Sequence, residues 1–376
     1  MPKLLKRIFV LPAIAAGVLW LWVILKPRDY PAPVFEPRPR TQYWKMRNGA
    51  SIGYTVISKR MEKKPYPVIY LHGGPGGHIS DGHIQALAPL ADSGFRVYLY
   101  DQIGSGHSDR LNDIDDYTVQ RHLDDLGEIV RKLNAPKVIL VGQSWGAVLA
   151  SLFAAEYPEL VHRMVLTSPG PVFPMHSQLA DLPVPDSILL KPPVYGNEMG
   201  NHMAANWRTK AMKWMAIHTG LKLASDKEAD QFASYLSQLV DRSIVCDTSR
   251  ILPADAGSGY YASIKTFQSL LEISDPRPKL RAVQASVLVM KGQCDNQKWG
   301  YTKEYLDLFP RGDLKIIPGA GHAIEVEQPG LYIRSILDFL TAPGVKKVMR
   351  RYPCSRWLAN SVFSFSKDVG LLLPLA

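Results

Sequence analysis

The sequence predicts an α/β fold in which a mostly parallel sheet is covered by helices on both faces. Eight short apolar stretches are predicted to be strands, and helical stretches separate most of the later ones. Short apolar strands without polar alternation are typical of parallel sheets that are buried on both faces. The predicted strands are Tyr43–Arg47, Ile52–Ser58, Val68–Leu71, Val97–Tyr100, Val138–Val141, Met164–Thr167, Val287–Met290 and Leu314–Ile317.

The fifth predicted strand ends in a G-x-S-x-G pattern, Gly142-Gln143-Ser144-Trp145-Gly146, which opens a stretch rich in Ala and Leu. A tight strand-to-helix turn of this kind lifts the serine hydroxyl above the sheet, and the glycines let the backbone pass closely. The backbone N–H of Trp145 then lies at a helix N-terminus, where it stabilises an oxyanion. The pattern predicts Ser144 as a nucleophile; the alternative is a Gly-rich turn with a capping serine.

A serine nucleophile requires a base and an orienting carboxylate, which in this architecture follow the serine in the order Asp, His. Asp295 and His322 come just after the last two predicted strands. Enzymes with parallel sheets place their catalytic residues at the edge formed by the C-terminal ends of the strands. We expect Ser144 to attack an acyl carbon, His322 to take and return its proton, and Asp295 to fix the imidazole tautomer. Asp307 and Asp313 are poorer acids because they fall in a predicted helix and a turn.

The loop after the third predicted strand is rich in glycine, with the sequence HGGPGG from His72 to Gly77. Its amides can face a ligand because no side chains obstruct them. We expect the N–H of Gly74, or alternatively that of Gly73, to be the second oxyanion donor beside that of Trp145. A phosphate-binding loop is excluded by the pattern, since no G-K-[ST] is present and no G-x-G-x-x-G opens a helix here.

Together, HGGPGG, the stretch DQIGSGHS at Asp101–Ser108, GQSWG, GQCD and GAGH resemble the alpha/beta hydrolase fold. Within that fold, the residues are most similar to the prolyl iminopeptidase-like group, over about residues 51–342. The resemblance implies the same nucleophile, acid, base and oxyanion donors as the residue pattern does. It implies a Ser-His-Asp triad that cleaves an amide or ester bond through an acyl-enzyme, and it implies no metal or organic cofactor.

One departure from the family bears on the substrate. In prolyl iminopeptidases a W-E pair in the helical middle carries a glutamate that is thought to bind the free amino group, whereas here Met215 follows Trp214. Methionine cannot replace a carboxylate as the partner of an ammonium group. Glu198, Glu228 and Asp230 are the substitutes that the middle of the chain offers. We expect aminopeptidase action of the proline iminopeptidase type, with a carboxylesterase or acyl-lipid hydrolase as the alternative.

The middle of the chain, residues 171–280, does not continue the alternation of strands and helices and is rich in helical stretches and loops. It lies between the nucleophile and the acid, so we expect it to emerge at the active edge of the sheet. There it would form a helical cap over Ser144. The hydrolase core is then predicted over residues 41–170 and 281–343.

Residues 1–28 are predicted to be a membrane anchor or signal segment, because Ile8–Leu25 is apolar, uncharged and flanked by basic residues. Its length barely suffices for a bilayer core of roughly 30 Å. We expect an uncleaved single-pass transmembrane anchor with the catalytic domain outside the cytoplasm; a cleaved signal peptide is the rival. Residues 29–40 are predicted to be a stiff Pro-rich spacer.

The net charge of +10 lies largely near the two ends of the chain. This placement favours contact with membrane lipid over nucleic-acid binding. Residues 344–376 form a basic and apolar tail, predicted to be an added helix or a second membrane-touching element. The three cysteines are odd in number and widely spaced, which predicts neither a disulfide framework nor a metal site. The expected partner is a small-molecule or peptide substrate.

Overall fold

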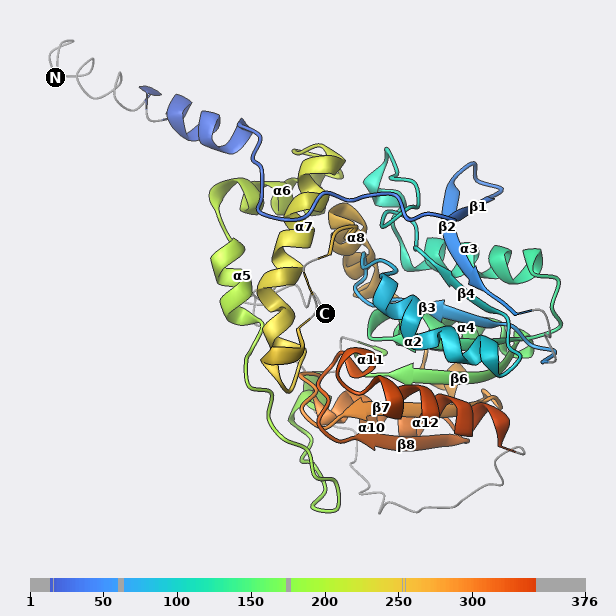
Figure 1. Cartoon of the computed structure of the whole chain (residues 1–376). Coiled ribbons are helices and arrows are strands. Elements are labelled where there is room, and N and C mark those ends of the chain that lie inside the picture. Colours follow the sequence, from blue (N-terminus) through green and yellow to red (C-terminus); the bar gives the residue numbers. More distant parts are fainter. Residues whose placement is uncertain are drawn as a thin grey trace, which may run out of the picture.

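A computed structural model describes residues 14–342, except for residues 16, 60–63, 174–176, 252 and 254. Its centre is an eight-stranded sheet with the strand order β1-β2-β4-β3-β5-β6-β7-β8 (Figure 1). β1 pairs antiparallel with β2, and β2 with β4, whereas the other pairings are parallel. The mostly parallel, eight-stranded sheet is therefore as predicted. The strands are β1 (Gln42–Lys45), β2 (Ser51–Ile57), β3 (Val68–Leu71), β4 (Val97–Tyr100), β5 (Val138–Gln143), β6 (Val161–Thr167), β7 (Ser286–Gly292) and β8 (Gly312–Ile317).

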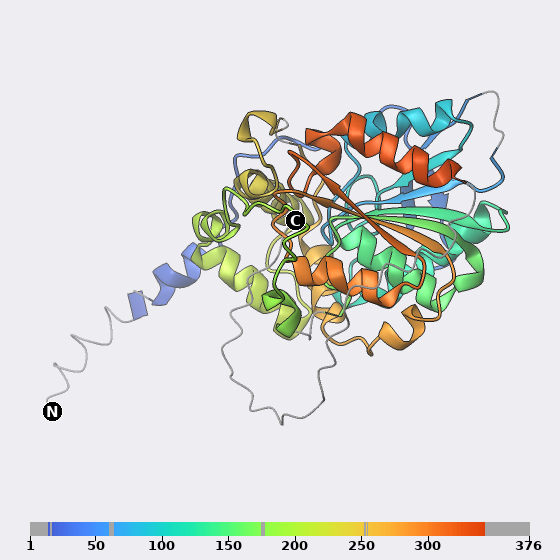
Figure 2. The same cartoon turned by 90° about the horizontal axis from the view of Figure 1, so that it is seen from below.

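Helices cover both faces of the sheet because successive strand residues point to opposite sides. Val68 and Tyr70 on β3 belong to one buried cluster, with α2 and α12. Ile69 and Leu71 of the same strand belong to the other, with α3, α4 and α10; Figure 2 shows the two helix layers on either side of the sheet. The covering elements are α2 (Asp81–Asp92), η1 (Ile114–Asp116), α3 (Val119–Lys132), α4 (Trp145–Glu156), η2 (Pro158–Leu160), α10 (Trp299–Leu308), α11 (Ile324–Glu327) and α12 (Pro329–Thr341).

A group of helices is inserted between β6 and β7, and we call it the cap. Figure 1 shows α5 and α7 on the side of the sheet to which the arrowheads of β6 and β8 point. Asn206 and Ser225 begin α6 and α7, because their side chains accept N–H groups of the first turn. The predicted boundaries of the core, residues 41–170 and 281–343, and of the cap, residues 171–280, remain predictions. The cap elements are η3 (Ser177–Asp181), α5 (Glu198–Ala204), α6 (Trp207–Thr219), α7 (Asp226–Val240), η4 (Asp241–Ser243), η5 (Thr248–Arg250), α8 (Tyr260–Leu270) and α9 (Arg277–Leu280).

The N-terminal helix packs on the cap, and the predicted transmembrane segment is wrong. Within the described ranges, no helix is long and apolar enough to cross a membrane, which takes about 20 apolar residues. The helix over residues 17–25 ends where the chain meets the cap. There Arg208 donates to the carbonyl oxygen of Ile24, and Trp20 lies edge-on to Trp207 with ring centroids 6.4 Å apart. The same finding overturns the predicted membrane location and gives no support to the predicted lipid contact through this segment. Residues 8–13 of the predicted span and the tail 344–376 lie outside the described residues.

Residues 28–40, which we call the strap, run from this helix across the cap to β1 (blue in Figure 1). At one end, Tyr30 is buried and its ring packs on Phe232 of α7, with centroids 5.0 Å apart. At the other end, the backbone N–H of Arg38 donates to Nε2 of His107 at 2.7 Å. The stretch for which the sequence predicts a spacer is thus held against the folded protein at both ends.

Candidate active site

Ser144 lies at the turn between β5 and α4, with φ 53° and ψ −116°. A non-glycine residue at positive φ is strained, and a strained strand-to-helix turn raises the serine side chain above the sheet. The Ser144 N–H donates to the carbonyl oxygen of Thr167 at 2.9 Å. Close packing explains both glycines of the pattern. A Cβ on Gly146 would collide with the carbonyl oxygen of Leu71, and one on Gly142 would collide with that of Gly146.

Asp295 and His322 meet in a buried hydrogen bond, although 27 residues separate them. Asp295 follows β7 and His322 follows β8. The Nδ1–H of His322 donates to Oδ1 of Asp295 at 2.9 Å, and the two side chains are 1% and 0% exposed. This bond fixes the tautomer in which Nε2 carries the free lone pair.

Nε2 of His322 is buried and has no hydrogen-bond partner among the described residues. Ser144 is therefore not hydrogen-bonded to it in this structure. Catalytic hydrogen bonds are often long before substrate binds, so this geometry does not exclude the predicted pair. The structure thus joins the predicted acid and base directly and leaves the base unpaired.

Lys291 is a buried cation that the sequence analysis missed. Its ammonium group donates to Oδ2 of Asp295 at 3.0 Å and to the carbonyl oxygen of Gln297 at 2.7 Å. Burial alone would raise the pKa of Asp295, but Lys291 and His322 hold that pKa well below its ordinary value. The signal in the sequence is a charged residue that directly follows an apolar strand, four residues before the predicted acid.

The Gly-rich loop after β3 brings the predicted oxyanion donors to the site. Gly73 adjoins Ser144, since a Cβ on Gly73 would lie 3.2 Å from the Cβ of Ser144. Gly74 has φ 118°, a backbone conformation that side chains disfavour. Both glycines line a cavity that His322 also lines. The N–H of Trp145 is the first of α4, at the residue that follows Ser144.

Gln102, which the sequence analysis did not single out, holds this loop in place through hydrogen bonds. Its side-chain oxygen accepts from the indole N–H of Trp145 at 2.8 Å, and its side-chain nitrogen donates to the carbonyl oxygen of His72 at 3.0 Å. Its backbone N–H donates to Nε2 of His72 at 2.9 Å. Burial lowers the pKa of His72 to about 4, so the ring is neutral near pH 7 and Nε2 can accept.

The cavity beside His322 has a volume of about 1080 Å³. Helices α7 and α8 of the cap line it through residues such as Val240 and Tyr260, and residues 34–39 of the strap line it as well. Ligand pockets of this size hold small molecules or short peptides. The cap and the strap therefore shape the space in which a substrate would meet His322.

Five carboxyl residues of the described part of the chain line this cavity: Asp241 of η4 and Glu325 of α11, whose pKa values are both raised, and Glu36, Asp81 and Asp255. Burial raises the pKa of Asp241 to about 6 and also raises the pKa of Glu325. Oε2 of Glu325 is buried and has no hydrogen-bond partner within the described ranges. Its other oxygen lies 3.9 Å from Nε2 of His83, whose pKa is lowered to about 3 by burial. These carboxyl groups can receive a cationic group of a ligand.

The acids that the sequence offers in place of the W-E glutamate have other partners. Glu228 pairs with Arg208 in the cap, with an oxygen-to-nitrogen distance of 2.6 Å. Asp230 accepts from Arg110 at 2.7 Å. The side chain of Glu198 is outside the described part of the structure.

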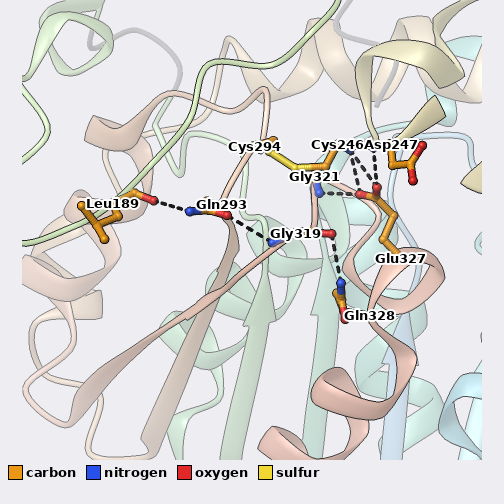
Figure 3. Close-up of a disulfide and its surroundings, with 9 residues drawn as sticks. All are labelled: Leu189, Cys246, Asp247, Gln293, Cys294, Gly319, Gly321, Glu327 and Gln328. Atoms are coloured by element: carbon orange, nitrogen blue, oxygen red, sulfur yellow. Dashed lines mark hydrogen bonds between the residues drawn. A yellow bond between two sulfur atoms is a disulfide. The ribbon is translucent and has the colours of Figure 1, made fainter.

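The sequence predicts no disulfide framework, and the structure corrects this prediction. Cys246 of the cap forms a disulfide with Cys294, which lies beside Asp295 (Figure 3). The Cα atoms are 5.4 Å apart, and 48 residues separate them in the sequence. Spacing alone could not reveal this pair, because it depends on how the cap folds back onto the end of β7.

Comparisons with known proteins agree with this architecture. The sequence profile of the alpha/beta hydrolase fold matches residues 66–329. A proline iminopeptidase of Heyndrickxia coagulans is 26% identical over 276 residues, which are 73% of this chain and 91% of that protein. Two solved structures share the fold. A proline iminopeptidase of Mycobacterium smegmatis is 20% identical with a TM-score of 0.54, and covers 80% of this chain and 97% of its own. An esterase of Exiguobacterium antarcticum is 15% identical with a TM-score of 0.56, and covers 80% of this chain and 99% of its own. The resemblance predicted from the motifs is confirmed: the chain belongs to the alpha/beta hydrolase fold family and is a hydrolase similar to the proline iminopeptidases.

Proposed function

We propose that the chain is a serine hydrolase that cleaves an amide or ester bond through an acyl-enzyme. The observation that carries this proposal is the buried hydrogen bond from His322 to Asp295, which leaves Nε2 of His322 without a partner beside the cavity. Ser144 on its strained turn supplies the hydroxyl group. An oriented imidazole with a free lone pair is the base that activates a serine nucleophile.

The reaction proceeds in two halves. In the first, Oγ of Ser144 attacks the acyl carbon while its proton passes to Nε2 of His322, and Asp295 stabilises the imidazolium. The N–H groups of Trp145 and of the Gly-rich loop donate to the oxyanion of the tetrahedral intermediate. Collapse expels the amine or alcohol, which takes the proton from His322 and leaves the acyl group on Ser144. In the second half, water gives a proton to His322 and attacks the acyl-enzyme. The second tetrahedral intermediate then collapses, Oγ of Ser144 leaves and takes the proton back from His322, and the acid is released.

We propose aminopeptidase action of the proline iminopeptidase type as the lead subclass. A free α-ammonium group needs a carboxylate partner in the pocket, and Asp241 and Glu325 both line the cavity. The unpaired Oε2 of Glu325 supports this assignment, because a buried carboxyl oxygen without a partner is costly until a donor arrives. The similarity to a proline iminopeptidase over most of both chains supports it as well.

A carboxylesterase or acyl-lipid hydrolase is the second candidate, favoured by one observation. Met215 follows Trp214 where prolyl iminopeptidases have the W-E glutamate, and Glu228 and Asp230 already pair with arginines. An ester substrate has no ammonium group and would not need a carboxylate at that place.

A substrate panel with the full chain separates the two subclasses. Proline naphthylamide, its N-blocked form and short p-nitrophenyl esters would be compared for kcat and KM. An aminopeptidase cleaves the free amine faster than the blocked one, and Glu325→Gln raises KM for the free amine while leaving KM for the esters unchanged. Faster turnover of the blocked substrate excludes an aminopeptidase and favours the esterase.

A further inference from the structure

The loops that carry Asp295 and His322 meet a segment of the cap at one place, drawn in Figure 3. We call this place the junction; it consists of Cys246, Cys294, Glu327 and the backbone next to them. We propose that Glu327 is a positioning residue which, with the Cys246–Cys294 disulfide, holds both loops in register and ties them to the cap. This inference rests on the proposed function, because it takes His322 and Asp295 as the base and the acid.

The carboxyl group of Glu327 accepts hydrogen bonds from three backbone N–H groups on two separate segments. The N–H groups of Cys246 and Asp247 in the cap donate at 2.9 Å each. The N–H of Gly321 donates at 2.5 Å to Oε2, an oxygen that the N–H of Cys246 also approaches. Glu327 is only 2% exposed, so these bonds are sheltered from solvent. Because Gly321 directly precedes His322, Glu327 fixes the point at which the imidazole leaves the backbone.

Backbone hydrogen bonds close the junction from the other side. The N–H of Cys294 donates to the carbonyl oxygen of Ala320 at 2.9 Å, and the N–H of Ala323 donates to that of Ile244 in the cap at 3.0 Å. A Cβ on Gly321 would lie 2.5 Å from the carbonyl oxygen of Ile244, so a glycine is needed for the cap to approach. The loop of His322 is therefore packed directly against the cap.

The disulfide adds the loop of the acid to the same unit. Cys294 directly precedes Asp295, and its partner Cys246 is one of the residues whose N–H is held by Glu327. One covalent bond and one carboxyl group thus connect the acid, the base and the cap. A displacement of about 1 Å in a catalytic group can lower the rate about 10²-fold, so loosening either connection lowers turnover.

Two perturbations loosen the junction in different ways. In Glu327→Gln an amide nitrogen replaces one carboxyl oxygen. This nitrogen cannot accept hydrogen bonds from the backbone N–H groups that face it. Reduction by dithiothreitol, a dithiol, gives the disulfide two electrons and two protons; two thiols form, and the reagent is oxidised to its cyclic disulfide. The double variant Cys246→Ser/Cys294→Ser lacks the disulfide without the use of a reductant.

Kinetics on the full chain give the first test, with Glu128→Gln as the matched control. Glu128 also accepts a backbone N–H, that of Arg47 at 3.1 Å, but lies on α3. We expect Glu327→Gln and the double variant to lower kcat about 10- to 100-fold with less than about a threefold change in KM. Dithiothreitol is expected to lower kcat of the wild type by a similar factor and to leave that of the double variant unchanged. Glu128→Gln is expected to keep kcat.

Amide hydrogen exchange gives a second test that does not depend on turnover. In Glu327→Gln we expect faster exchange at Gly321, Cys246 and Asp247, and in Glu128→Gln unchanged exchange at these three amides. Unchanged exchange in Glu327→Gln, or an equal loss of kcat in Glu128→Gln, overturns the proposal. If the wild type hydrolyses no substrate, the proposed function fails, while the exchange data still decide whether Glu327 holds the junction.

Discussion

Lys291 places a buried positive charge directly behind the proposed acid, and its removal tests the electrostatics of the site. The ammonium group lies 3.0 Å from Oδ2 of Asp295, while Oδ1 of the same carboxylate accepts from His322. A cation at this place opposes the positive charge that the imidazole takes up when it accepts a proton. We therefore expect Lys291→Met to raise the pH at which kcat/KM falls on the acid side.

Coulomb's law sets the size of this shift. The ammonium group and the imidazole contact different oxygens of one carboxylate, so we take their charges to be roughly 7 Å apart. At an effective dielectric constant of about 20 this separation of roughly 7 Å gives about 2.4 kcal/mol, or about 1.7 pH units. Adjustment of the buried carboxylate reduces the effect, so we expect an upward shift of about one pH unit. Glu325 and Glu327, which follow His322 on α11, are present in both proteins, and their influence cancels in the comparison.

The assay is kcat/KM from about pH 5 to about pH 9, the range in which a catalytic imidazole titrates. Loss of one partner from a buried ion pair costs about 3–5 kcal/mol of stability, so a control of similar cost is needed. Arg208→Met provides it, because Arg208 pairs with Glu228 in the cap and both side chains are buried. We expect the control to lose stability with its acid midpoint unchanged. A midpoint that stays or falls in Lys291→Met would show that the charge of Lys291 does not act on His322.

Three further predictions concern the cavity wall, the serine turn and the strap. The pKa of Asp241 is raised to about 6. Burial of its charged form therefore lowers the free energy of unfolding above that pH, and it has no effect below about pH 4, the ordinary pKa of an aspartate. Asp241→Asn should therefore raise the stability measured by thermal unfolding by about 1 kcal/mol at pH 8 and leave it unchanged near pH 4; an equal gain at both would contradict this. Gly146→Ala should cost about 3 kcal/mol in urea unfolding, since its Cβ collides with the carbonyl oxygen of Leu71, and wild-type stability would show that the turn is less tight. Tyr30→Ala, which removes the ring packed on Phe232, should speed proteolytic cleavage within residues 28–40, whereas an unchanged cleavage rate would mean that the strap is held elsewhere.

The proposed catalytic residues can be picked out from the sequence because the ends of apolar strands are visible in it. Ser144, Asp295 and His322 each follow such a strand, and parallel strands bring their carboxyl ends to one edge of a sheet. This rule was sufficient to predict the contact between Asp295 and His322. It could not identify Lys291, since a charge at the end of a strand usually faces solvent, and only the fold turns this one toward the acid.

Contacts between the cap and the rest of the chain could not be predicted, because they depend on how long connections fold back. The pairing of Cys246 with Cys294 and the cavity-facing place of Asp241 are of this kind. The N-terminal stretch shows the same limit. Its apolar composition fits a membrane or a protein surface equally well, and only the contacts of Trp20 and Ile24 with α6 reveal that its end packs on the cap.

In the proposed mechanism, His322 activates Ser144 as the nucleophile. Mass spectrometry of the full chain after reaction with a fluorophosphonate tests it most directly. We expect a single adduct on Ser144, absent in Ser144→Ala and formed at least about 10²-fold more slowly in His322→Ala. An unlabelled wild type, or equal labelling of Ser144→Ala, would contradict it.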